Sequence, residues 1–218
     1  MTRPPRQAAF TLIEMITVIA IIAILAGLVL AINGVVQKKS ATARADAEIR
    51  QLSSALESYK TDNGGYPQDL AKTDSLDARK TADATDTSAT GKLAQSSLYL
   101  YESLSGDTDG NGTIDSTETA KNYAPDFFKP SRLGGIKDPN TGKVSPVQYI
   151  MDPFGNPYGY STAGLLLEQE FRANLATNAS ATRPAQNSKG TQGYNPTFDL
   201  WSCAGDTAGL TAKWIKNW

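Results

Sequence analysis

The sequence contains no histidine and one cysteine, Cys203, among its 218 residues. Without histidine the chain cannot build a Ser-His-Asp or Cys-His catalytic site, a His-ligated zinc site or a histidine pH switch. One cysteine cannot form an internal disulfide or a thiolate metal cluster, and a lone cysteine is typically a small buried apolar residue. No pair of acids has a recognisable catalytic spacing either, so we do not expect an enzyme.

An excess of charge of one sign is also absent. The chain carries 21 basic and 22 acidic residues, for a formal net charge of −1. No stripe of lysine and arginine with interleaved aromatics is present, so a nucleic-acid partner is not expected. The length suits one modest globular domain with appendages.

What the chain does have is a long apolar run near its N-terminus. In residues 15–32 the only polar residue is Thr17, and 18 such residues reach the length of a membrane-spanning helix. Arg3 and Arg6 precede the run, so the positive-inside rule places the N-terminus in the cytoplasm. A secretory signal peptide is an alternative, but the run is long for one and has no A-x-A site at its end. Glu14 comes directly before this stretch. Inserting a carboxylate at membrane depth costs about 2.5–3.5 kcal/mol of free energy.

Beyond residue 39 the pattern becomes amphipathic. Spacings of 4, 3, 4 and 3 place five apolar residues on one helical face: Ala45, Ile49, Leu52, Leu56 and Tyr59. The residues between them are predicted to face solvent: Arg44, Asp46, Glu48, Arg50, Gln51 and Glu57. We expect one helix from Phe10 to about Asp62, with Asn33-Gly34 as its weak point, ended by Asn63-Gly64-Gly65. An anchor helix followed by a separate soluble helix is the alternative.

A short basic leader, then Phe10-Thr11-Leu12-Ile13-Glu14, then about twenty apolar residues resembles the class III signal of type IV pilins and type II secretion pseudopilins. The resemblance implies that a prepilin peptidase cuts between Ala9 and Phe10 and N-methylates Phe10; the family usually has glycine before the cut. It also implies that Glu14 faces the N-terminal amine of a neighbouring subunit in a fibre, which would offset the cost of its burial. The alternative is a carboxylate near the membrane interface without a partner.

The resemblance also implies an α+β, type IV pilin-like fold, in which a long N-terminal helix packs on a small antiparallel β-sheet. It divides the chain into a leader (1–9), a transmembrane or fibre-core segment (10–36), the amphipathic half of the same helix (37–63) and a globular domain (64–218). Before assembly such a subunit crosses the bacterial inner membrane once, with its globular domain in the periplasm. The implied partners are further copies in a helical filament, minor pseudopilins, prepilin peptidase and the inner-membrane assembly platform.

Residues 107–118 match the EF-hand loop pattern D-x-[DN]-x-[DN]-G-x5-E at every specified position. We therefore predict one calcium site with a structural role, entered by a helix from Leu93 to Leu104 and followed by a short helix before Pro125. The alternative is a solvated acidic loop. The predicted ligands are the side chains of Asp107, Asp109, Asn111, Asp115 (often through water) and Glu118, and the carbonyl of Thr113.

Three further segments carry structural signals. Residues 71–92 are rich in Thr, Asp, Ala and Ser, and predict a variable, mobile loop. Residues 147–161 predict a hairpin, whose D-P-F-G-N-P-Y turn resembles that of major pseudopilins. Residues 198–202 predict a final strand, and the three tryptophans near the C-terminus are interpreted as core anchors.

The C-terminal tail resembles the pseudopilin pattern in part. Asp199, Ser202, Gly205 and Asp206 match its first half and Asn217-Trp218 its end, but the acids that bind calcium in that family are missing. Our hypothesis is that the loop at 107–118 has taken over their stabilising role.

The function expected from these features is that of a structural subunit of a periplasmic pseudopilus of a type II secretion system. One alternative is a type IV pilin for adhesion, motility or DNA uptake, although one cysteine cannot form the C-terminal disulfide loop that such pilins usually have. Another is a membrane-anchored calcium-binding protein that never polymerises.

Overall fold

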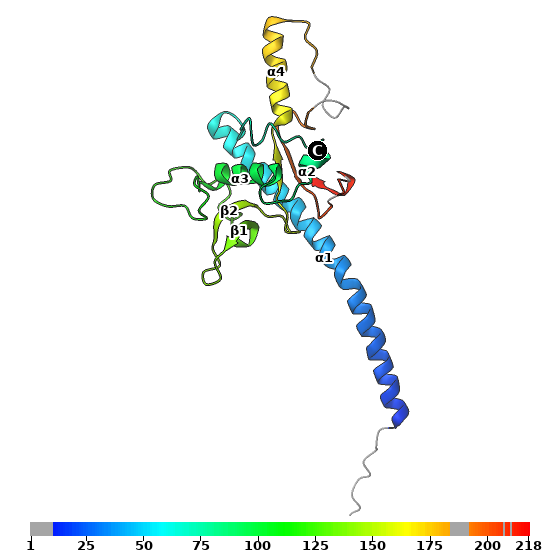
Figure 1. The fold of residues 1–218 in the computed structure, drawn as a ribbon. Helices are drawn as coiled ribbons and strands as arrows, with labels where there is room; N and C mark the ends of the chain where they lie inside the picture. Colours follow the sequence, from blue (N-terminus) through cyan, green and yellow to red (C-terminus); the bar gives the residue numbers. More distant parts are fainter. Residues whose placement is uncertain (1–10, 184–191, 207, 210) are drawn as a thin grey trace, which may run out of the picture. The chain divides into compact units, whose positions relative to one another are not determined.

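The computed structural model describes residues 11–183, 192–206, 208–209 and 211–218, with the backbone alone for residues 29–33 (Figure 1). Ala9 and Phe10, the residues of the predicted cleavage site, therefore lie outside the described residues. The chain divides into two units, Met1–Ala41 and Thr42–Trp218.

One helix, α1 (Leu12–Asn63), contributes to both units. Its 52 residues run through Asn33-Gly34 without interruption, so the predicted single helix is confirmed and the alternative of two separate helices is wrong. The helix ends where predicted: Gly64, with a φ of 77°, donates its N–H to the carbonyl of Lys60 (2.8 Å). Glycine adopts this left-handed conformation without strain, and it is a common end of helices.

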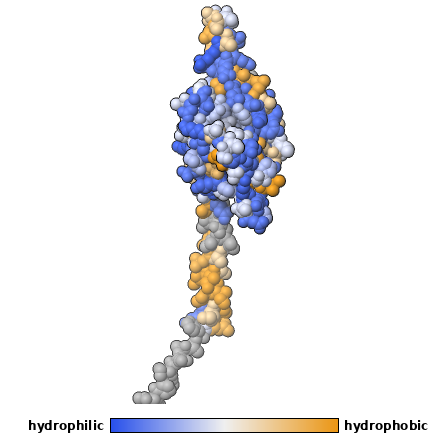
Figure 2. All heavy atoms as spheres, turned by 90° about the vertical axis from the view of Figure 1, so that its left-hand side faces the viewer, coloured by the Kyte–Doolittle hydropathy of each residue, from blue (hydrophilic) through white to orange (hydrophobic). Residues whose placement is uncertain are grey.

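In the first unit the large apolar side chains of α1 that the structure describes are exposed, and Leu12 is 77% exposed. The space-filling view shows them as a hydrophobic surface on this stretch (Figure 2). Among the described residues, no helix combines the length and the apolar character that crossing a membrane requires. The predicted span, residues 10–36, includes residue 10 and the side chains of 29–33, which lie outside the description.

In the second unit the other half of α1 contributes to the main hydrophobic core. The predicted apolar face is buried, with Ala45, Leu52 and Leu56 each 0% exposed, whereas Tyr59 is partly buried. Around this face pack α3 (Lys92–Ser105), which covers the range of the predicted helix, and the described strands. The α+β fold class is thus confirmed, with a long helix packed on small antiparallel sheets.

The described strands form two antiparallel sheets. One pairs β1 (Leu133–Lys137) with β2 (Val144–Ile150), and the other has the order β3 (Gly159–Ser161), β4 (Asp199–Ser202), β5 (Ile215–Lys216). The predicted strand at 198–202 is confirmed as β4. The predicted hairpin at 147–161 is confirmed at its turn, where Met151 forms an antiparallel bridge with Pro157 and the N–H of Tyr158 donates to the carbonyl of Ile150 (3.0 Å). Beyond this turn β2 and β3 diverge into different sheets. The remaining elements are the helices α2 (Thr81–Ala84) and α4 (Ala163–Thr177) and two 3-10 turns, Pro130–Arg132 and Thr211–Lys213.

The segment 71–92 is largely irregular, as predicted, but it is packed rather than loose. Leu76 and Ala84 are fully buried in a second hydrophobic cluster, together with Trp201 and Trp214. The few apolar side chains of the segment therefore anchor it to the core, although its composition predicted a mobile loop. Trp201 and Trp214 act as core anchors, as predicted, and Cys203 is buried beside them.

Candidate functional site

The first described residues of α1 form a capping box. Thr11 precedes the helix, and its side-chain oxygen accepts a hydrogen bond from the N–H of Glu14 (3.4 Å). The Glu14 carboxylate accepts hydrogen bonds from the N–H (2.8 Å) and the hydroxyl (2.7 Å) of Thr11. Two donors at the helix start are thereby satisfied reciprocally. The carboxylate of Glu14 thus has polar partners within its own chain, an arrangement that the T-x-x-E spacing could have predicted.

The acidic loop at 107–118 begins at the end of α3. Gly106 ends the helix in a left-handed conformation (φ 87°), and Asp107 follows it. Asp107 is fully buried, and its carboxylate accepts hydrogen bonds from the Tyr101 hydroxyl (2.6 Å) and from the N–H groups of Asn111 (3.1 Å) and Gly112 (2.7 Å). Asp107 therefore holds the loop against α3 and sets its curvature.

The other side of the loop lies against β2. Gly110 accepts a hydrogen bond from the N–H of Val147 (2.8 Å). At Gly112, with a φ of 83°, a Cβ atom would lie 2.1 Å from the carbonyl oxygen of Val144. Only glycine fits this close approach, and its positive φ also allows the sharp turn expected at this point of an EF-hand pattern.

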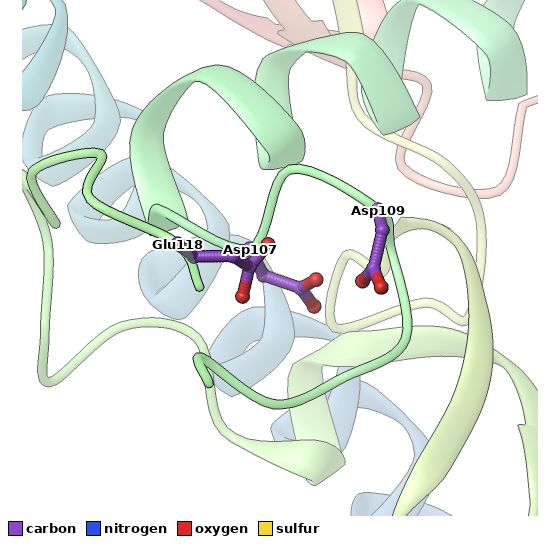
Figure 3. Close-up of side chains that lie close together, drawn as sticks. All are labelled: Asp107, Asp109 and Glu118. Carbon is purple, nitrogen blue, oxygen red and sulfur yellow. The ribbon is translucent and has the colours of Figure 1, made fainter. Parts of the chain in front are cut away.

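Three of the predicted ligands converge. Asp107, Asp109 and Glu118 each offer a carboxylate oxygen, and these oxygens lie within 4.8 Å of one another. Figure 3 shows the side chain of Glu118, from the end of the loop, beside that of Asp107, with Asp109 further along the stretch that follows Asp107. Carboxylate oxygens are the ligands that Ca²⁺ prefers, so this donor set fits the predicted ion. Glu118 is held in place by Thr108, whose N–H and hydroxyl (2.9 Å) both donate to it.

The remaining predicted ligands lie around this group. Asn111 links to Asp109 through its side-chain amide (2.8 Å), and its oxygen accepts the N–H of Thr113 (2.9 Å). Asp115 is outside the converging group, and its carboxylate accepts the N–H of Thr117 (2.8 Å). The predicted helix after Glu118 is wrong, because residues 119–129 contain no helix. The first half of the loop thus resembles an EF-hand, whereas its end lacks the helix that follows an EF-hand loop.

The ionisation of the converging acids differs with their surroundings. Burial raises the pKa of Asp107, and hydrogen bonds to its carboxylate counteract this rise. The side-chain amide of Asn111 lowers the pKa of Asp109, and the N–H of Asp115 lowers that of Glu118. Asp109 and Glu118 therefore carry negative charge at neutral pH, and a bound cation would relieve their repulsion.

A second polar group, which the sequence reasoning missed, lies inside the second unit. Glu48 was predicted to face solvent but is 4% exposed, so that prediction is wrong. Its carboxylate accepts the hydroxyl of Tyr158 (2.8 Å) and pairs with Arg132 (3.4 Å) and Arg44 (3.9 Å). A buried carboxylate is retained only where it is paired and hydrogen-bonded. Its spacing, three residues after Ala45 and four before Leu52, places it at the edge of the apolar face, and this signal could have indicated its burial. The partners that satisfy it come from distant parts of the chain.

Comparison with known proteins gives three matches. Residues 4–30 match the family described as the prokaryotic N-terminal methylation motif, and residues 34–103 match the type II secretion system protein G family. Over 77 residues, or 35% of its length, the chain is 39% identical to the type II secretion system core protein G of Aeromonas hydrophila. That stretch covers 54% of the relative, so the chain spans about half the length of the curated protein it matches. No solved structure matches. The first match includes residues 10–14, which carry the resemblance, and the second begins after the motif, at Gly34.

Proposed function

We propose that this chain, whose matches support the major pseudopilin family, is a structural subunit of a periplasmic pseudopilus of a type II secretion system. In this proposal a prepilin peptidase cuts before Phe10 and methylates it. Before assembly the subunit lies in the inner membrane, with its globular part in the periplasm. It then assembles through α1 with further copies, minor pseudopilins and the assembly platform. The proposal includes no catalytic activity.

The observation that carries the proposal is the matched N-terminal motif, followed directly by exposed apolar side chains on α1. Exposed surfaces of this kind mark contact with a membrane or with another protein. A subunit that passes from a bilayer into a fibre uses the same surface twice, first against lipid and then against sister helices. The match at 34–103 favours a secretion pseudopilin over a type IV pilin.

Glu14 has a different partner in each of these two states. In the separate subunit its carboxylate caps α1 through Thr11, which reduces the cost of placing it in the membrane. In the fibre the cationic amine of Phe10 from a neighbouring copy would pair with it and fix the stagger between subunits.

The calcium site is part of the proposal. Asp107, Asp109 and Glu118 would hold the ion, with Asn111, Thr113 and Asp115 completing the shell directly or through water. The ion would supply positive charge that joins the two arms of the loop, and Asp107 would couple it to α3 through Tyr101. The role is structural, and an extracytoplasmic site of this kind belongs to the class with affinities of about 10⁻⁴–10⁻³ M.

Substitution of Glu14 tests the assembly role. Glu14→Gln keeps the size of the side chain and can accept a hydrogen bond from Thr11, but it cannot pair with an amine as an anion. We expect normal membrane insertion and at least a tenfold loss of filaments sheared from cells, as the loss of one charge-assisted contact per interface implies. Asp46→Asn is the matched control, because Asp46 pairs with Arg50 inside the same helix (2.7 Å). Filaments as abundant in Glu14→Gln as in the control would refute the assembly role.

A further inference from the structure

A cavity of about 270 Å³ lies in the second unit, between the buried part of α1 and the turn that follows β2. Its lining contains the guanidinium groups of Arg44, on α1, and Arg132, directly before β1. The hydroxyl group of Ser131 also lines it. Two carboxylates, Glu48 and Asp152, complete the polar part of the wall. Neither the role proposed for the N-terminal motif nor the role proposed for the acidic loop involves this cavity.

The acceptors in the cavity wall are already occupied. Glu48 accepts the Tyr158 hydroxyl on one oxygen and faces both arginines with the other. Asp152 is 3% exposed and accepts the N–H groups of Phe154 (2.9 Å) and Asn156 (2.8 Å) on one oxygen and the Ser202 hydroxyl on the other. Both carboxylates are therefore part of the packed structure and offer little to a ligand.

The donors, by contrast, are only partly used. Arg44 has a side chain that is 62% exposed and lies 3.9 Å from Glu48, which is beyond hydrogen-bonding distance. Arg132 faces Glu48 through Nε at 3.4 Å, while its guanidinium lies over the Phe127 ring at 4.7 Å. Within the described part of the chain, neither guanidinium makes a hydrogen bond through its terminal nitrogens. Planar guanidinium forks of this kind match the oxygens of carboxylate and phosphate groups.

We propose that this cavity binds a phosphate group, and that in the cell the group belongs to the headgroup of an anionic phospholipid. Two guanidiniums from different elements suit a tetrahedral anion, which presents oxygens in several directions, better than a planar carboxylate. The volume of the cavity is close to the lower limit of small-molecule sites. A ligand larger than a single carboxylate group therefore fits into it.

The choice of a lipid rests on the proposed function, because it needs α1 to start in a membrane. The predicted membrane segment ends at residue 36, and Arg44 follows only eight residues later, after Lys38 and Lys39. Basic residues directly beyond a membrane segment are attracted to the anionic headgroups of the leaflet that they adjoin. The cavity adds to this general attraction a site of defined shape, which would hold the globular part at the headgroup layer until the subunit leaves the membrane.

The test uses the full chain in a neutral detergent, titrated with short-chain phosphatidylglycerol, short-chain phosphatidylcholine or inorganic phosphate. Binding is followed by native mass spectrometry and by the rise of the melting temperature. We expect phosphatidylglycerol to bind, and Arg44→Gln to weaken its apparent affinity about tenfold, as the loss of one charged hydrogen-bonding partner implies. Arg132→Lys keeps the charge but loses the fork and should weaken binding too. Arg50→Gln is the matched control, since Arg50 is an exposed arginine of the same helix that pairs with Asp46.

The probes separate the possible sources of the phosphate. Inorganic phosphate that protects as well as phosphatidylglycerol would support the phosphate site but overturn the assignment to a lipid. Equal binding of phosphatidylglycerol by Arg44→Gln and by the control would overturn the site. Self-association without lipid that Arg44→Gln abolishes, in a chain that binds none of the probes, would overturn it in favour of a carboxylate from a second copy. Absence of cleavage before Phe10 would instead refute the proposed function, and the detergent titration would still decide on the phosphate site.

Discussion

Replacing one converging carboxylate of the acidic loop should reduce the stabilisation that calcium gives. Asp109→Asn is the best change, because Asp109 is exposed and the amide keeps an oxygen that can accept the N–H of Asn111 (3.0 Å). Asp107 is less suitable, since its burial and its contact with Tyr101 make it part of the core. Glu118→Gln provides an independent second variant.

The size of the effect follows from mass action. With a dissociation constant of about 10⁻⁴–10⁻³ M, about 10 mM Ca²⁺ should raise the free energy of unfolding by roughly 1.4–2.7 kcal/mol. For a unit the size of Thr42–Trp218 this corresponds to a rise in melting temperature of roughly 3–10 °C. A tenfold weaker site would reduce the gain to roughly 0.4–1.4 kcal/mol. Without calcium, Asp109→Asn should be no less stable than the wild type, since one repulsion between like charges is removed.

The assay is thermal unfolding followed by circular dichroism, over a calcium titration with magnesium as the comparison ion. The matched control is Asp138→Asn, because Asp138 also caps backbone N–H groups in an exposed turn, those of Asn140 (2.8 Å) and Thr141 (3.4 Å), but lies outside the acidic loop. Asp138→Asn should keep the full response to calcium. If Asp109→Asn and Glu118→Gln respond as strongly as this control, the reasoning is refuted and calcium binds elsewhere or not at all.

Three further predictions concern the stability of the second unit and can be measured by urea unfolding. Glu48→Ala should lower the free energy of unfolding by about 3–5 kcal/mol, because it leaves Arg132 near the core without its anion; a loss below about 1 kcal/mol would mean that the carboxylate is not paired in solution. Leu56→Ala should cost about 2–5 kcal/mol, since Leu56 is fully buried, and an unchanged stability would contradict the packing of α1 in the core. Burial raises the pKa of Asp199 to about 6, so its ionisation opposes folding: its contribution is most favourable below pH 4 and is lost as the pH rises through 6. Relative to Asp199→Asn, the wild type should therefore lose up to about 3 kcal/mol between pH 4 and pH 7, and a constant difference would contradict the raised pKa.

The helical part of the fold could be predicted from the sequence because its signals are local. The apolar face of α1, its end at Asn63 and the helix α3 all follow from spacing and from the glycines that come after. The strand β4 was also predicted, as a short run of apolar and aromatic residues. Each of these signals lies within one element and needs no knowledge of its partners.

Features that depend on distant partners could not be predicted. The buried Glu48 accepts a hydrogen bond from the hydroxyl of Tyr158, 110 residues away. The turn at 151–157 forms as its composition predicts, but the sequence does not show that beyond the turn β2 pairs with β1 and β3 pairs with β4. In the same way, Leu76 and Ala84 are buried against the C-terminal tryptophans, although the composition of their segment is that of a loose loop.

The candidate site shows the same division. The pattern of residues 107–118 predicted the donors, and the structure brings three of their carboxylates together. The pattern could not indicate that Asp107 is buried or that Asp115 lies outside the group. It also could not indicate that no helix begins directly after Glu118. The packing of the loop between α3 and β2 decides these points.

The most direct test of the account is the mass and N-terminal sequence of the full-length protein isolated from the membranes of a bacterium that has a type II secretion system. We predict a chain that starts at Phe10, carries one methyl group on its amine and lacks residues 1–9. A strain without prepilin peptidase should yield the uncut chain. An intact leader in the presence of the peptidase, or a cut beyond residue 30 as for a secretory signal, would contradict the central claim that this chain is a processed pseudopilus subunit.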